Sequence, residues 1–107
     1  MHLSFTGVYT ATKSCDDQML SAKSDKIKKY LQELEDSNPE VLESFVELRL
    51  NQRVIEVDLT VAGGSLEETA SRADALIKEA ILKAIGRAPD GQMYLQRKST
   101  ECEILSR

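Results

Sequence analysis

Few residues of this chain suit acid–base chemistry. Glu56 and Asp58 share one face of an alternating stretch, and Glu101 and Glu103 are likewise two residues apart. Paired carboxylates can serve as general acid and base. The single histidine, His2, lies at the start of the chain, so neither pair has an evident imidazole partner. Ordinary solvated charge is the preferred interpretation, and we expect no enzyme.

The two cysteines do not suggest a nucleophile or a metal site. Cys15 is followed by Asp16 and Asp17, and neighbouring negative charge raises the pKa of a thiol. Cys15 and Cys102 lie far apart without the CxxC spacing of zinc ligands. A disulfide between them stays open, although two unpaired thiols are preferred in a reducing cytosol. We expect no metal and no cofactor.

The Gly63-Gly64 pair has two interpretations. Glycines between a strand and a helix can bind phosphate, because free backbone N–H groups and the helix dipole favour an anion. Here Glu67 and Glu68 occupy the first turn of the predicted helix, where their charge repels phosphate. A structural turn is therefore preferred to an anion site.

Basic residues gather in the two predicted helices. The early helix carries Lys23, Lys26, Lys28 and Lys29, and the final helix carries Lys78, Lys83 and Arg87. The start of a helix prefers anions, so the first group is unfavourable unless the helix begins earlier or an external anion compensates. If the helices pack side by side on a sheet, their exposed sides form one basic surface. Two ordinary solvated helix faces are the alternative.

The elements that position these residues begin with a strand and a long helix. Residues 2–12 interleave apolar and small polar side chains, which suits a strand that bends near Gly7. Helical spacing follows for Ile27, Tyr30, Leu31 and Leu34. Ser14 with Asp17 suggests a capped start well upstream of that run, and the Ser-Asn-Pro stretch at 37–39 ends the helix.

Residues 45–50 and 53–62 predict two half-buried strands. One side of the alternation carries Val46, Leu48, Leu50, Ile55, Val57, Leu59 and Val61. The Asn51-Gln52 link suits a tight hairpin, because Asn tolerates the positive φ of such turns. The outward residues Glu47, Arg49, Glu56, Asp58 and Thr60 give a charged open face. This face does not resemble the aromatic platform of RNA-recognition sheets.

A second helix follows Gly64. Ser65 with Glu68 forms an S-x-x-E capping pattern, and Gly86 followed by Pro89 predicts the end. Its apolar stripe comprises Leu66, Ala70, Ala73, Ile77, Ala80, Ile81, Ala84 and Ile85. Residues 89–107 fit a last strand or an ordered tail, and the pattern leaves both open.

The whole chain predicts a single domain over residues 1–107, with a formal charge of −4. No stretch approaches the roughly 20 apolar residues of a membrane span, and the N-terminus lacks the pattern of a secretory signal. We therefore expect a cytoplasmic protein that binds neither membrane nor DNA. Because net negative charge opposes non-specific adhesion to phosphate, any RNA role must depend on a local basic patch.

Four stretches resemble one family. They are MHLSFTG at 1–7, AKSDKIKKYL at 22–31, RVIEVDLTVAGG at 53–64 and ALIKEAILKA at 75–84. Together they are similar to the ribosome hibernation promoting factor family, also called the ribosome-associated inhibitor or sigma-54 modulation family, over about residues 1–87.

The resemblance implies a stress-response factor that binds the small ribosomal subunit near the decoding region and blocks the tRNA and mRNA path. Lys23, Lys26 and Lys83 match the basic helix residues of the family. By the same resemblance, we expect them to contact rRNA phosphates, with Lys29, Lys78 and Arg87 as neighbours.

The predicted fold is α+β, a two-layer domain whose four-stranded, antiparallel-dominated sheet carries two helices on one face. In the hibernation-factor arrangement a strand separates the Gly-Gly turn from the last helix. In the ferredoxin-like β-α-β-β-α-β order, the helix follows the Gly-Gly turn directly. The helix content after Gly64 distinguishes them.

The leading functional hypothesis is a non-enzymatic ribosome-binding factor that represses translation or protects idle ribosomes. The alternative is a ferredoxin-like protein-interaction or oligomerisation module, which would use the open sheet face or an exposed edge strand, and a homodimer stays open. A small dimeric enzyme ranks third, because no residue set defines its ligand cavity.

Overall fold

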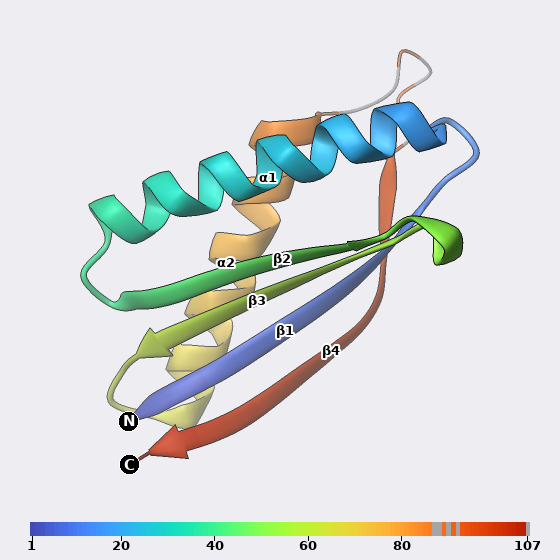
Figure 1. The fold of residues 1–107 in the computed structure, drawn as a ribbon. Coiled ribbons are helices and arrows are strands. Elements are labelled where there is room, and N and C mark those ends of the chain that lie inside the picture. The colour runs from blue at the N-terminus through green and yellow to red at the C-terminus, as the bar shows by residue number, and fades with distance from the viewer. Residues whose placement is uncertain (87–88, 90, 92, 107) are drawn as a thin grey trace.

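The computed structural model describes residues 1–86, 89, 91 and 93–106. Its elements are β1 (His2–Ala11), α1 (Asp17–Ser37), β2 (Val41–Arg49), the short 3₁₀ helix η1 (Leu50–Gln52), β3 (Val54–Ala62), α2 (Leu66–Ile85) and β4 (Leu95–Ser106). The strands form one antiparallel sheet in the order β2-β3-β1-β4. Both helices cover the same face of it (Figure 1). The predicted α+β class is confirmed.

The order of elements after Gly64 is that of the ferredoxin-like arrangement. α2 begins at Leu66 without an intervening strand, and β4 comes last. Of the two alternatives for the C-terminal stretch, the structure has the strand. β4 pairs with β1 antiparallel. His2, near the N-terminus, therefore lies opposite Ser106, near the C-terminus (Figure 1).

The core lies between the sheet and the two helices. Alternate residues of the central strands β1 and β3 are buried, because every second side chain points toward the helices. The largest side chains buried there come from both layers: Leu3, Leu20, Ile27, Leu31, Ile55, Leu59, Leu76 and Ile77. Neither helix is long and apolar enough to cross a membrane, in the part of the chain that the structure describes.

Capping residues fix the ends of the helices. The side chain of Asp16, rather than the predicted Ser14, accepts a hydrogen bond from the N–H of Met19 at 2.8 Å at the start of α1. Ser65 accepts one from the N–H of Glu68 at 3.3 Å, as predicted for α2. Gly86 ends α2 with a φ of 70°, which suits a residue without a Cβ.

The turn between β2 and β3 differs from the predicted hairpin. Its left-handed residue is Arg53, with a φ of 55°, and not Asn51. The guanidinium of Arg53 donates to the Asp17 carboxylate at 2.5 Å and to the carbonyls of Thr12 and Cys15. These charge-assisted bonds to the loop before α1 offset the cost of the left-handed backbone. A tertiary contact therefore sets the turn.

Two apolar residues predicted for the inner side are exposed. Leu50 lies in η1, where the chain has left the strand, and 42% of it is accessible. Leu66 is the first residue of α2 and is 46% exposed, and the buried residues of the helix begin only at Thr69. The rest of the stripe is wholly or partly buried.

An ionic network joins β1, β4 and α2. Arg97 donates to the hydroxyl of Tyr9 at 2.5 Å and forms an ion pair with Asp74, which also binds Lys78 at 3.1 Å. Burial opposes ionisation of Asp74, but the hydrogen bonds from Arg97 and Lys78 outweigh it and lower the carboxyl pKa below its ordinary value of 3.8. The Arg97 side chain thus links the edge strand β4 to both β1 and α2.

We predict that Gly63→Ala destabilises the domain, because a Cβ at this position would overlap the hydroxyl of Thr69. Overpacking of this kind costs about 1 to 3 kcal/mol of unfolding free energy, measurable by urea denaturation. Gly64→Ala is the matched control, since nothing lies within 4 Å of its Cβ position. A Gly63→Ala variant as stable as the Gly64→Ala variant would contradict the close packing.

We predict that Asp74→Asn lowers the unfolding free energy by about 1 to 3 kcal/mol at neutral pH, because it removes the carboxylate partner of Arg97. Since the folded pKa of Asp74 is depressed, its contribution is present above the ordinary value and is lost as pH falls through the folded pKa. Urea titrations should therefore show the difference from the wild type shrinking below about pH 4.

Asp25→Asn is the control for this prediction, because Asp25 is exposed on α1 and has no ion pair within the described part of the chain. An Asp74→Asn effect that stays constant down to strongly acidic pH would rule out the linkage.

Candidate functional site

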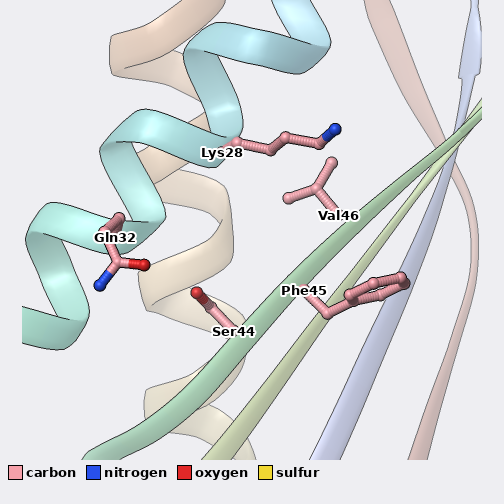
Figure 2. Close-up of a pocket in the computed structure, with 5 residues that line it drawn as sticks. All are labelled: Lys28, Gln32, Ser44, Phe45 and Val46. Carbon is pink, nitrogen blue, oxygen red and sulfur yellow. The ribbon is translucent and has the colours of Figure 1, made fainter.

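The outer edge of β2 is the candidate site of this domain. It borders a groove of about 260 Å³ whose walls come from α1 and from the strand itself. Lys28 and Gln32, one helical turn apart on α1, form one wall, as Figure 2 shows. Ser44 and Val46 point toward the helix, and Phe45 points to the opposite side of the strand. An extended segment along β2 would therefore meet side chains on both of its faces.

The backbone of β2 supplies the polar groups of this groove. β2 is the end strand of the sheet and pairs only with β3. In an antiparallel edge strand, alternate residues direct their N–H and C=O groups away from the sheet. From Glu43 to Arg49 the pairing with β3 runs without a register shift, so these groups form a regular row. Such a row can accept another strand.

Two side chains beside the backbone edge of β2 are available to a partner. Phe45 is 55% exposed, the largest fraction among the exposed large apolar side chains of the described residues. Lys28 has no carboxylate within ion-pair distance in the described ranges, so its charge is available to a partner. Ser44 is fixed by donating to Glu35 of α1 at 3.1 Å. The groove thus combines an apolar contact, a cation and a backbone edge.

The opposite edge of the sheet is less suited to strand pairing. β4 shifts register between its partners Val8 and Tyr9, which leaves Lys98 as an extra, exposed residue in a bulge. Bulges and edge lysines are features that discourage edge-to-edge pairing. Charged Glu101 and Glu103 continue along the same strand. Of the two edges, β2 is therefore the better template.

The open face of the sheet is acidic beside Phe45. Glu56 and Asp58 of β3 project from it, and burial together with the charge of Asp58 raises the pKa of Glu56. Arg49 compensates by pairing with Glu47 and Glu56, each at 3.1 Å. The predicted charged open face is confirmed. The carboxylates are engaged with Arg49, and with Thr6, which donates to Asp58.

Three of the six predicted RNA-binding residues come together. Lys26 and Lys29 of α1 and Lys83 of α2 line a groove of about 300 Å³ beside the ring of Tyr30. Lys83 lies 5.6 Å from the centre of that ring and pairs with Glu79 at 2.8 Å, and these contacts raise its pKa. α1 and α2 contact each other over the same face of the sheet, as the predicted basic surface requires (Figure 1).

The other predicted residues lie elsewhere. Lys23 folds over the Tyr94 ring at 4.0 Å and donates to the carbonyl of Ile85 at 3.4 Å, and burial lowers its pKa. It therefore satisfies the C-terminal end of α2 and has a structural role. Lys78 pairs with Asp74 in a different groove. Arg87 lies outside the described residues.

The residues considered for chemistry remain dispersed. Cys15 is buried and Cys102 is exposed, both as free thiols, which confirms the preferred interpretation of the pair. Burial is the main reason why the pKa of each thiol is raised. The N–H of Gly63 bonds to the carbonyl of Met1 at 3.0 Å, so it is not free for an anion. Within the described ranges no cluster of His, Cys, Asp and Glu could hold a metal ion.

Sequence reasoning missed the β2 groove. One signal was present: Phe45 falls on the outward side of a strand whose other outward residues are polar. The partners from α1 had no such signal, because Lys28 was one of several lysines and Gln32 is an ordinary surface residue. Their proximity to β2 depends on how α1 crosses the sheet.

Comparison with known proteins gives the fold and nothing finer. No protein-family model matches the chain, and no curated protein matches it. Among solved structures it is similar to one titled "Crystal structure of Putative Chlorite dismutase TA0507", with a TM-score of 0.56 and 8% sequence identity. The match covers 94% of this chain but 42% of that one. At this identity the likeness supports the α+β sandwich of β-α-β-β-α-β order.

Proposed function

We propose that this domain is a non-enzymatic protein-interaction module that binds an extended segment of a partner protein by strand addition to β2. The observation that carries the proposal is the regular, uncovered edge of β2 from Glu43 to Arg49, flanked by α1. Strand addition to a sheet edge is a recurrent mode of peptide recognition, in which backbone hydrogen bonds supply affinity and side-chain contacts supply specificity.

The groove defines the partner segment. Residues on one face of an added strand would lie between β2 and α1, near Val46 and Lys28, and those on the other face would lie near Phe45. An acidic side chain on the first face would pair with Lys28, and an apolar side chain on the second would cover Phe45. The expected segment is thus extended, free of proline at its centre, and carries one acidic and one apolar residue on opposite faces.

A selection from a library of random peptides tests this function. We expect enrichment of segments with these features, and we expect their binding to shift the amide NMR signals of β2 and of α1 around Lys28. Phe45→Lys should weaken the binding about tenfold or more, because it removes the apolar contact and places a charge on the edge.

Leu105→Lys is the matched control, since Leu105 is 52% exposed on the other edge strand, β4. It should leave peptide binding unchanged. A library that yields no binder, or binders whose signals map to β4 or to α2, would reject strand addition at β2.

Ribosome binding remains a second candidate, favoured by the groove that gathers Lys26, Lys29 and Lys83. An aromatic side chain such as Tyr30 among cations suits contact with RNA. The carboxylates of Glu33 and Glu79 in or beside this groove, and the net charge of −4, oppose it. Both functions are compatible with the predicted cytoplasmic location, which forms part of this proposal.

Sedimentation with ribosomes and separated subunits tests the second candidate. If it holds, the protein migrates with the small subunit at low salt, and raising the salt weakens the association. The triple change Lys26→Glu, Lys29→Glu and Lys83→Glu should abolish it. A protein that stays out of every ribosomal fraction at low salt is not a ribosome-binding factor.

The same triple change on three lysines outside the groove provides the control for charge alone. Lys13, Lys28 and Lys98 are suitable, because none of them lines it. If both triple variants lose ribosome binding equally, the net charge of the protein, rather than this groove, governs the association.

A further inference from the structure

A third groove lies between α2 and β4. Its volume is about 450 Å³, and its walls are mainly apolar. Ile81 and Leu82 contribute one wall from α2, and Leu95 contributes the other from β4, with Met93 just before it. Leu82 is 50% exposed, whereas Ile81 and Leu95 are buried. An apolar hollow of this size is within the range that holds small ligands.

Of the residues that the structure describes, the two charged ones that line this groove are both cations. Lys78 and Arg97 line it directly, while their shared partner, Asp74, does not. The two positive charges and the single carboxylate leave the cluster with a net charge of +1. Among the described residues, Tyr9 and Gln96 add further polar groups to the lining. The rim of an apolar groove is therefore electropositive in a chain whose formal charge is −4.

We propose that this groove binds a small amphipathic monoanion, an apolar chain or ring that carries one carboxylate. The apolar part would lie against Ile81, Leu82 and Leu95, and it would remove the exposed surface of Leu82 from water. The carboxylate would lie at the rim beside Lys78 and Arg97 and would balance the excess positive charge. A neutral apolar molecule would leave that charge uncompensated, and a dianion would exceed it.

The lining favours a small molecule over a peptide strand. The groove lies on the helix-covered side of β4, where Arg97 donates a hydrogen bond to the hydroxyl of Tyr9 and both side chains line it. Because β4 and β2 are opposite edges of the sheet, this site is independent of strand addition at β2. The two proposals can therefore fail separately.

Octanoate and octan-1-ol, which have equal chain length, test the proposal by NMR titration of the full chain. We expect octanoate to shift the amide signals of Leu82, Met93 and Arg97 and to bind at least several-fold more tightly than octan-1-ol. Leu82→Glu should weaken octanoate binding about tenfold or more, because it places a carboxylate in the apolar wall. Lys78→Gln should weaken octanoate binding and leave octan-1-ol binding unchanged.

Matched controls lie on the same helix. Leu66→Glu alters an equally exposed leucine of α2 outside the groove, and Lys83→Gln removes a lysine that pairs with its own carboxylate elsewhere. Neither should change octanoate binding, and Phe45→Lys should not change it either. The proposal is wrong if octanoate produces no shifts in this groove, if octan-1-ol binds equally well, or if Leu82→Glu binds octanoate as the wild type does.

Discussion

The structure depends on the burial of one apolar face of a four-stranded sheet beneath two helices. β1 and β3 lie at the centre of that sheet, are paired on both sides, and contribute alternate side chains to the core. Because only one face is covered, the other side chains of the same strands stay at the surface, and they are largely polar. A chain of 107 residues can bury one such layer and little more. The other face of the sheet and the outer edges of its end strands, β2 and β4, therefore remain uncovered by helices.

The two edges differ in ways that decide how the surface can be used. β4 is fastened by the Arg97 network to β1 and α2, carries a bulge at Lys98, and presents alternating charge. β2 has no such bulge between Glu43 and Arg49 and exposes Phe45. Charged residues occur on both edges, but the bulge with its lysine that protects β4 has no counterpart in the middle of β2. This asymmetry, more than any single residue, supports an interaction at β2.

Several charged side chains of this domain form ion pairs with one another. Lys83 pairs with Glu79 and Lys78 with Asp74 one turn apart on α2, while Arg49 pairs across β2 and β3. Such pairs contribute little stability at an exposed surface, but they determine which charges a partner meets uncompensated. Lys28 is one of these, and the rim formed by Lys78 and Arg97 retains one excess positive charge. The basic residues are thus less uniform in role than their number in the sequence suggests.

The sequence by itself determined the two helices and the first three strands, the inner side of the two hairpin strands β2 and β3, and most helix ends, but it left β4 open. These follow from local rules: the period of apolar residues, the cap at Ser65 and the glycine at position 86. Only the tertiary structure decided which strands are edges, that Lys23 covers Tyr94 while Lys26 and Lys29 meet Lys83, and that Arg53 takes the left-handed turn. Those features depend on contacts between residues far apart in the chain and on the rotation of each helix over the sheet. No local pattern encodes them.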